Sequence, residues 1–307
     1  MNYCIVGLGR HATHRVIPSI LQSKSKLIAT VSTRNNSIKN VPNFKKLSIA
    51  LKELPKNTIF FLCTPLSVRQ KQIINCLKNS YNVISEKPIF TEVRYLNESL
   101  TYVKQKRLFL YEHLIYVNSI AYEKFLSLYQ SKKKQINIIH LNFLIPSFPK
   151  NTFRDQYSLE ENIVYDIGCY PISFLGNLKL NLSDYKLSFK RSKSNKKLLI
   201  FIFDNEFLKI KIKIGISKIY QNNLEVFYSK NKVLFNYFFY GLSQKKNQKF
   251  FVDNKLIKNK SYLDRNSFIF LFNQKASFFK NNSKCLIKNF QSIVVLKKFL
   301  KLVNTSN

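Results

Sequence analysis

The sequence predicts an α/β protein with an N-terminal, doubly wound parallel sheet and a C-terminal α+β domain whose sheet is mostly antiparallel. Two observations carry this prediction. Up to about residue 115, short apolar runs alternate with helical patterns across short connections, which is typical of a parallel sheet covered by helices. Beyond residue 135, strand-like segments follow one another with turn residues between them, which favours antiparallel pairing.

The individual elements follow from hydrophobic periodicity and from the residues that end each segment. In the N-terminal half we expect strands over "NYCIVG" and residues 26–34, 58–65, 81–88 and 107–115, and helices over 11–23, 68–79, 91–106 and 118–131. In the C-terminal half we expect strands over 136–145, 185–192, 197–205, 207–217, 223–231 and 232–242. The segment "LKIKIKI" alternates apolar and basic residues, so one face of this sheet should be wet. We expect domains at 1–115 and 116–307, with the last helix, about 289–303, available to pack back on the first domain.

The composition is strongly basic. Lys and Arg number 51 against 16 Asp and Glu, a net charge of +35, which favours nucleic acid or another anionic partner. Most of these residues are Lys rather than the Arg typical of phosphate recognition, and the basic runs lack the interleaved aromatic residues of a single-strand groove. We therefore attribute most of the charge to base composition and solubility, and nucleic-acid binding is the less favoured alternative.

The cysteines and the N-terminus indicate a cellular location. Five widely spaced cysteines without a C-x-x-C motif indicate reduced thiols rather than disulfides or a zinc site. The N-terminus lacks the features of a signal peptide, and no apolar run approaches the roughly 18 residues that span a bilayer. We expect a cytoplasmic protein with no membrane segment.

The stretch "GLGRHA" follows the first predicted strand and opens a helix. In this G-x-G-x-x-A pattern the first glycine permits a tight turn, the second lets the backbone approach a pyrophosphate, and the alanine lets the helix pack on the strand. The start of the helix then offers N–H donors to phosphate. We therefore predict a Rossmann dinucleotide site at Gly7, Leu8, Gly9, Arg10, His11 and Ala12.

The end of the second strand bears on the choice of cofactor. An acidic residue usually holds the ribose 2′-hydroxyl of NAD there, whereas this chain has Ser32, Thr33 and Arg34. Hydroxyls and an arginine suit a 2′-phosphate, so NADP(H) is favoured over NAD(H); the alternative is that Arg34 is only a surface cation. His11 and His14 lie three residues apart on a helix, but without a third ligand nearby in sequence we expect no metal.

Two further strands end in short motifs at the edge where open parallel sheets bind ligands. These motifs are "CTP" (Cys63, Thr64, Pro65) and "EKP" (Glu86, Lys87, Pro88). Together with "GLGRHA" they resemble the glucose–fructose oxidoreductase/inositol dehydrogenase/MocA superfamily, whose members bind NAD(P) in an N-terminal Rossmann domain and act mostly on sugars and cyclitols. The resemblance implies that Lys87 lies beside the nicotinamide and contacts the reacting hydroxyl.

A second match lies in "VYDIGCYPISFL", residues 164–175. It resembles the D-x-G-x-H/Y segment of the same superfamily, in a form similar to the dihydrodiol/xylose dehydrogenase branch. By this resemblance Asp166 binds the substrate and Tyr170 occupies the position that transfers a proton. The resemblance thins after about residue 180. Two departures are "EENIV" before Asp166, where glycines are usual, and Arg69 in place of the usual His after T-P.

These matches lead to one favoured function and one main alternative. We expect an NAD(P)-dependent oxidoreductase acting on a hydroxyl or carbonyl of a sugar or sugar nucleotide, with surface-polysaccharide biosynthesis as one setting. Tyr170 would be the acid/base, Lys87 the polarising donor and Asp166 the orienting acceptor, with the first two roles reversible. The alternative is a non-catalytic or regulatory NAD(P)-binding protein. The resemblance also implies a homo-oligomer formed through the C-terminal sheet.

Overall fold

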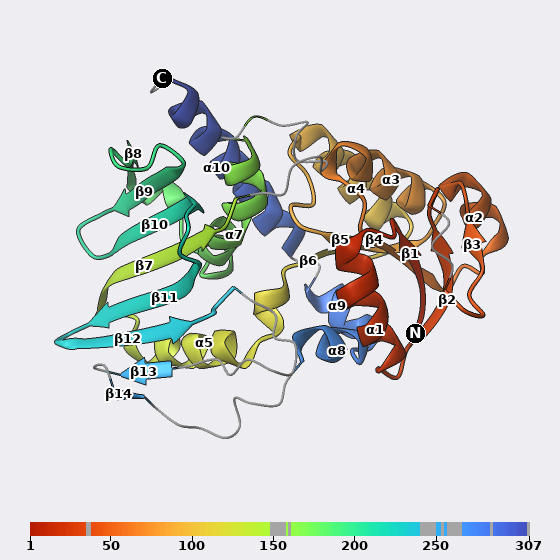
Figure 1. Ribbon diagram of the computed structural model, residues 1–307, viewed down its shortest axis with the longest axis horizontal. Coiled ribbons are helices and arrows are strands. Elements are labelled where there is room, and N and C mark those ends of the chain that lie inside the picture. Colours follow the sequence, from red (N-terminus) through yellow and green to blue (C-terminus); the bar gives the residue numbers. More distant parts are fainter. Residues whose placement is uncertain are drawn as a thin grey trace. The chain divides into compact units, whose positions relative to one another are not determined.

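Two compact units make up the computed structural model (Figure 1). Unit 1 combines Met1–Leu114 with Phe268–Ile293, and unit 2 combines Ile115–Ser267 with Val294–Asn307. The structure describes residues 1–34, 38–147, 158, 161–239, 250–252, 255–256, 266–282 and 285–305. The end of the strand expected over 232–242 lies outside these residues.

Unit 1 contains a six-stranded sheet in the order β3-β2-β1-β4-β5-β6, and every pair of neighbours is parallel. The strands are β1 (Asn2–Val6), β2 (Lys26–Val31), β3 (Asn43–Phe44), β4 (Thr58–Leu62), β5 (Asn82–Glu86) and β6 (Leu110–His113). The parallel sheet predicted from the sequence is confirmed. The strand order reverses between β1 and β4, and the carboxyl ends of strands at such a point flank the crevice where these sheets bind ligands.

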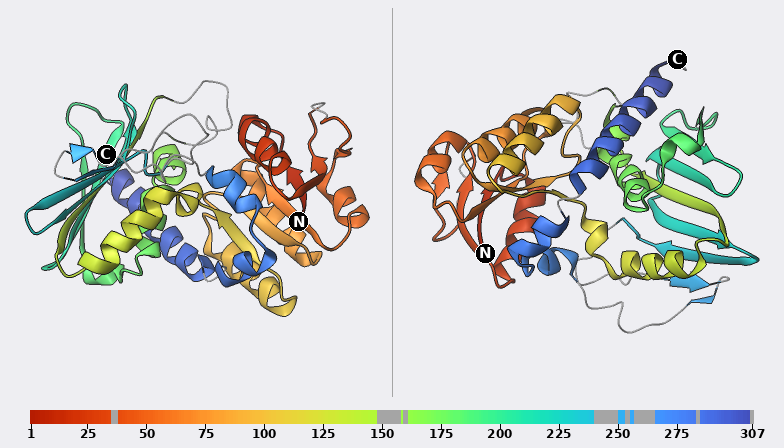
Figure 2. Two further views of the ribbon diagram at one scale, coloured as in Figure 1. Left: turned by 90° about the horizontal axis from the view of Figure 1, so that it is seen from below. Right: turned by 180° about the vertical axis from the view of Figure 1, so that it is seen from behind.

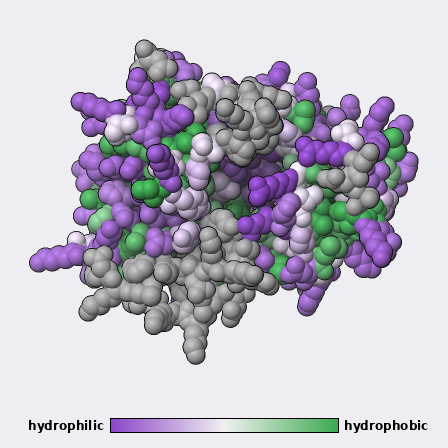
Figure 3. Space-filling view, viewed as in Figure 1, coloured by the Kyte–Doolittle hydropathy of each residue, from purple (hydrophilic) through white to green (hydrophobic). Residues whose placement is uncertain are grey.

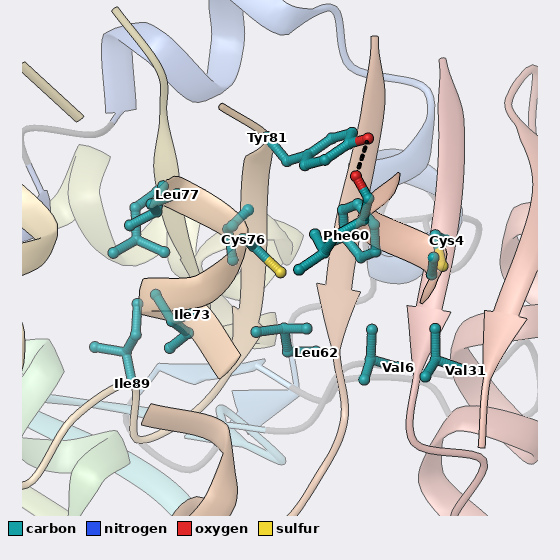
Figure 4. Packing of buried hydrophobic residues seen from close by; sticks show 14 of the residues in the cluster. Cys4, Val6, Val31, Phe60, Leu62, Ile73, Cys76, Leu77, Tyr81 and Ile89 are labelled. Carbon is teal, nitrogen blue, oxygen red and sulfur yellow. Dashed lines mark hydrogen bonds between the residues drawn. The ribbon is translucent and has the colours of Figure 1, made fainter. Parts of the chain in front are cut away.

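Helices cover both faces of this sheet (Figure 2). They are α1 (Ile17–Leu21), α2 (Leu47–Glu53), α3 (Leu66–Lys78), α4 (Val93–Gln105), α8 (Ser267–Phe272) and α9 (Ala276–Asn282). Cys4 and Val6 of β1 lie in a buried cluster with Ile73 and Cys76 of α3 (Figure 4). Side chains alternate along a strand, so Tyr3 points the other way and packs edge-on against Phe272 of α8, with ring centroids 5.2 Å apart.

The first helix differs from the expected one in its hydrogen bonding. The chain is helical from residue 10 to residue 21, but its first part is the wide π turn η1 (Ala12–Val16), in which the Ile17 N–H reaches back five residues to Ala12 O. Pro18 then stands in the first turn of α1. Proline lacks an N–H and crowds the preceding turn of a regular helix, and the local change of hydrogen-bond register accommodates it.

Unit 2 contains an eight-stranded sheet in the order β14-β13-β12-β11-β7-β10-β9-β8. Its strands are β7 (Ile136–Ile145), β8 (Lys186–Arg191), β9 (Leu198–Asp204), β10 (Lys209–Ile216), β11 (Gln221–Tyr228), β12 (Asn231–Asn236), β13 (Phe250–Val252) and β14 (Lys255–Leu256). All neighbours are antiparallel except β7 and β10. The mostly antiparallel sheet is therefore confirmed. Along β10 the isoleucines 210, 212 and 214 are buried while the alternating lysines are not, as "LKIKIKI" predicted.

Helices pack on the buried face of this second sheet. They are α5 (Ile120–Lys132), the π turn η4 (Asn162–Ile167), α7 (Cys169–Asn177) and the long α10 (Cys285–Thr305). Phe125 of α5 contacts Phe174 of α7 and Phe235 of β12. Phe299 of α10 stacks on Phe201 of β9 with ring centroids 3.6 Å apart. These aromatic contacts fix α5, α7 and α10 on the sheet (Figure 1).

Hydrophilic residues dominate the face drawn in Figure 3, with hydrophobic residues in small patches between them. This agrees with the 51 Lys and Arg residues of the chain. Among the described residues, no helix is both long enough and apolar enough to cross a membrane.

Candidate functional site

The glycine loop after β1 has the geometry that close approach of a ligand requires. Gly7 has a φ of +93°, and a Cβ placed on it would lie 2.8 Å from Cγ2 of Thr64. Only glycine accommodates both conditions. A Cβ placed on Gly9 would meet nothing within 4 Å, so the space beside this residue is open. The helix that follows, with Thr13 N–H bonded to Gly9 O, directs its first N–H groups into that space.

The strand end after β2 carries cations. The Ser32 hydroxyl accepts a hydrogen bond from the Arg34 backbone N–H over 3.1 Å, while the Thr33 and Arg34 side chains are exposed. Lys45, which follows β3, donates from Nζ to Thr33 O and Arg34 O at 3.5 Å each. Sequence reasoning did not single out Lys45, because only the pairing of β2 with β3 brings it here. The arrangement suits an anionic group better than a neutral hydroxyl.

Glu86, at the end of β5, joins two histidines from other parts of the chain. Its Oε1 lies 3.0 Å from Nε2 of His11, in the glycine-loop helix, and 2.8 Å from Nδ1 of His113, at the end of β6. His113 is buried and His11 is exposed. Sequence analysis missed His113; the signal that finds it is its place at the carboxyl end of the strand beside β5.

The pKa values of this group depend on one another. Burial alone would raise the pKa of Glu86, but the charges and hydrogen bonds of His11 and His113 hold it well below its usual range. For His11, desolvation lowers the pKa, but attraction and hydrogen bonding to Glu86 outweigh it, so the pKa is raised. The His11 side chain is 47% exposed, and we therefore consider the Glu86 charge the decisive influence.

The three side chains also have the residue types of a metal site, and their ligand atoms lie within 4.8 Å of one another. The second ring nitrogen of His113 argues against that role. Its Nε2 is buried and has no hydrogen-bond partner among the described residues. A metal on Nδ1 would move the ring proton to Nε2, whereas metal-bound histidines normally donate that proton to a partner. Donation of Nδ1–H to the Glu86 carboxylate gives that nitrogen a hydrogen-bond partner within the group itself, so the geometry favours a hydrogen-bonded chain.

Aromatic rings surround the buried end of this chain. His113 meets Phe61 of β4 edge-on and Phe268 of α8 at centroid distances of 5.3 and 5.0 Å. The Phe268 ring also contacts His11 at 5.7 Å. The segment from residue 268 therefore contributes to the site in unit 1, although it lies far along the chain.

The two predicted strand-end motifs lie next to each other in unit 1. Arg69 of α3 donates hydrogen bonds to the carbonyl oxygens of Thr64, in the "CTP" motif, and of Lys87 and Pro88, in the "EKP" motif. Burial raises the pKa of the Cys63 thiol well above its usual value, so this cysteine is not a ready nucleophile. We interpret Cys63 as a structural residue that follows β4.

Asp166 and Tyr170 lie in unit 2, on the chain segment that passes from η4 into α7. Both side chains are half-buried. The Tyr170 ring packs edge-on against Phe143 of β7, with centroids 5.2 Å apart, and lies 6.0 Å from the ring of Phe239. Gly168 lets this segment approach β10, since a Cβ there would lie 2.6 Å from Val164 O and 3.0 Å from Cδ1 of Ile214.

Unit 1 thus brings together the predicted residues of the glycine loop, the β4 end and the β5 end, while Asp166 and Tyr170 are placed together in unit 2. Two further residues belong to the first group. His14 hydrogen-bonds Arg10 O at 3.0 Å, and Arg69, a departure from the expected pattern, joins the ends of β4 and β5. The roles assigned to all these residues remain predictions.

Comparison with known proteins agrees with the fold. The model of the GFO_IDH_MocA family, described as an oxidoreductase family with an NAD-binding Rossmann fold, matches residues 1–113. No curated protein sequence matches this chain.

Solved structures match over nearly the full length. The chain is similar to KijD10, a 3-ketoreductase from Actinomadura kijaniata in complex with NADP and TDP-benzene, at 14% identity and a TM-score of 0.81, covering 97% of this chain and 96% of that one. It is also similar to an aldose-aldose oxidoreductase from Caulobacter crescentus, at 13% identity and a TM-score of 0.75, covering 100% and 98%. A third match is the UDP-N-acetylglucosamine 3-dehydrogenase GnnA from Acidithiobacillus ferrooxidans, at 10% identity and a TM-score of 0.71, covering 98% and 97%. Other structures of KijD10 carry a lysine-to-alanine or a tyrosine-to-phenylalanine replacement.

Proposed function

We propose, from the match of residues 1–113 to the model of the Gfo/Idh/MocA oxidoreductase family, that this chain interconverts a hydroxyl and a carbonyl of a nucleotide-linked sugar with NADP(H). The observation that carries the proposal is the joining of three strand ends in unit 1. Glu86 bonds His11 of the glycine loop, and Arg69 bonds both Thr64 and Lys87. The residue between Glu86 and Pro88 therefore stands at the edge where the dinucleotide binds.

The residues present fit the cofactor. The open space beside Gly9 leaves room for a pyrophosphate, and the helix start offers N–H groups to it. Arg34 and Lys45 suit a 2′-phosphate, which supports NADP(H) over NAD(H). When bound, the nicotinamide gives or accepts the hydride.

The chain's own residues handle the proton and the developing charge. For the reductive direction we assign Tyr170 the role of proton donor to the carbonyl oxygen and Lys87 the role of polarising hydrogen-bond donor. Asp166 accepts a hydrogen bond from a neighbouring hydroxyl and so orients the sugar. In the oxidative direction the same groups act in reverse. The nucleotide-linked substrates named for two of the similar structures and the net charge of +35 support an anionic sugar nucleotide as substrate.

The test is binding followed by turnover. Purified protein should change NADPH fluorescence at micromolar concentration and should oxidise NADPH with one member of a panel of TDP- and UDP-linked keto-sugars. Lys87→Met and Tyr170→Phe should each lower kcat on the order of 100-fold or more, while Lys71→Met, at an exposed position on α3, should not. NADPH binding without turnover on any panel member would favour a non-catalytic NAD(P)-binding protein, and absence of binding would refute the proposal.

A further inference from the structure

Arg69 is a buried arginine in the first turns of α3, only 5% exposed. One arm of its guanidinium, Nη1, donates to Thr64 O over 2.7 Å. The other arm, Nη2, donates to Lys87 O over 3.0 Å and to Pro88 O over 2.7 Å. A single side chain thus joins the main chain after β4 to the main chain after β5.

Two other side chains hold the residues that follow. Glu112 of β6 accepts a hydrogen bond from the Ile89 N–H over 2.9 Å. Gln70, next to Arg69 on α3, accepts one from the Thr91 N–H over 2.8 Å. The backbone from Lys87 to Thr91 is therefore held from the helix on one side and from the neighbouring strand on the other. The segment 87–91 after β5 has no regular secondary structure, but its contacts fix it.

The residue type at position 69 matters for this arrangement. The planar guanidinium directs its donors along two diverging arms, whereas the ammonium of lysine is a single point from which three donors radiate. Burying the charge costs free energy unless hydrogen bonds compensate it, and an apolar side chain would fill the same space without that cost. The three carbonyl acceptors compensate the cost of burying the Arg69 charge, and one of them is the carbonyl oxygen of Lys87.

We infer that Arg69 is a positioning residue that fixes the backbone of Lys87 relative to Thr64. The consequence for the enzyme, which rests on the function proposed above, is that the Lys87 ammonium starts from a fixed Cα when it meets the reacting oxygen. The consequence for the free protein rests on the hydrogen bonds alone. Loss of the guanidinium should free the segment 87–91 without unfolding the sheet.

Hydrogen exchange tests the second consequence without any substrate. Arg69→Lys keeps the charge but not the two arms, and the amides of residues 87, 89 and 91 should exchange at least tenfold faster, while those of β4 keep their rates. Arg94→Lys is the matched control, because Arg94 is exposed and contacts Glu92 over 2.8 Å and its neighbour Tyr95, not the segment 87–91. Unchanged exchange at 87–91 in a folded Arg69→Lys protein would overturn the inference.

If Arg69→Lys does not fold, Glu112→Leu provides a second test of whether the segment 87–91 is fixed. It removes the acceptor of the Ile89 N–H on β6, and it should speed hydrogen exchange at the amide of residue 89. Unchanged exchange there would count equally against a fixed segment. These results stand whatever the enzyme's substrate, so a failure of the proposed function would be seen separately, as absent NADPH turnover by the unaltered protein.

A double-mutant cycle tests the first consequence. Arg69→Lys should lower kcat on the order of 10- to 100-fold and change the Kd for NADPH by less than about threefold. In a Lys87→Met background the same substitution should cost less than about twofold, because a positioning residue has nothing left to position. Equal losses in both backgrounds would mean that Arg69 acts on general structure and not through Lys87.

Discussion

His113 donates its Nδ1 hydrogen to Oε1 of Glu86 across 2.8 Å. The same oxygen accepts from His11, so a histidine on β6 and a histidine in the glycine loop share one carboxylate. Three segments far apart in the sequence thereby meet at the carboxyl edge of the parallel sheet. The charge on Glu86 stabilises a proton on the exposed ring of His11, whose pKa it raises.

Glu86→Gln should lower the pKa of His11. The carboxylate charge is what raises it above the ordinary value of 6.5, and an amide carries no charge. A group with a raised folded-state pKa stabilises the fold fully below its unfolded pKa and loses this contribution as pH rises through the folded pKa. The variant should therefore lose stability at low pH relative to the unaltered protein and approach it at high pH.

Imidazole resonances followed by NMR between pH 5 and 9 measure this change directly. An unchanged His11 midpoint in Glu86→Gln would show that the carboxylate does not hold its proton.

Glu112→Gln should remove a pH dependence of opposite origin. Burial raises the pKa of Glu112 from 4.5 to about 7, although the Ile89 N–H and the charges of Arg69 and Lys87 oppose the rise. Between pH 4.5 and about pH 7 the folded state binds more protons than the unfolded state. The free energy of unfolding therefore falls as pH rises through this range, by up to about 3 kcal/mol. Glutamine keeps the acceptor for Ile89 and carries no charge to bury.

Urea unfolding at pH 5 and pH 8 measures the effect. The variant should gain stability over the unaltered protein at pH 8 and should differ little from it at pH 5. Glu98→Gln, at an exposed position on α4, is the control. The same stability difference at both pH values would contradict a buried, titrating carboxyl.

Alternating strands and helices were sufficient to predict the parallel sheet, and the alternation in "LKIKIKI" was sufficient for the wet face of β10. Both are local patterns whose periodicity records burial. The short helix α2 and the C-terminal helices α8 and α9 were not predicted. Phe272 and Phe279 of the last two pack on the sheet of unit 1, a contact that no local pattern in the sequence can indicate.

The candidate site divides in the same way. The glycine loop and the strand ends were predicted because parallel strands place their carboxyl ends at one edge. The places of His113 and Lys45 and the hydrogen bonds of Arg69 were not predicted. Each depends on which strands are neighbours and on the direction of the side chain. Arg69 appeared in the sequence as a departure from a motif, and the structure gives it three backbone acceptors.

Arg34→Ala should reduce discrimination for NADP(H). If the cations after β2 and β3 bind a 2′-phosphate, loss of one charge-assisted hydrogen bond should raise the Kd for NADPH about tenfold or more and leave that for NADH nearly unchanged. Lys45→Ala should act in the same direction, because its ammonium lies over the carbonyl oxygens of Thr33 and Arg34. Fluorescence titrations with the two nucleotides measure the ratio. An equal loss for both nucleotides would assign these residues to another part of the cofactor or to none.

Alanine at the two loop glycines should separate stability from cofactor binding. Gly7→Ala should destabilise the fold by about 1–3 kcal/mol, because it forces a side chain into a φ of +93° and against Thr64. Gly9→Ala should change stability by less than about 0.5 kcal/mol, since its Cβ would meet no protein atom within 4 Å. The same methyl group would occupy the space proposed for the pyrophosphate, so the Kd for NADPH should rise at least tenfold. Thermal unfolding and NADPH titration of both variants measure the two quantities, and an unchanged Kd in a stable Gly9→Ala protein would place the cofactor elsewhere.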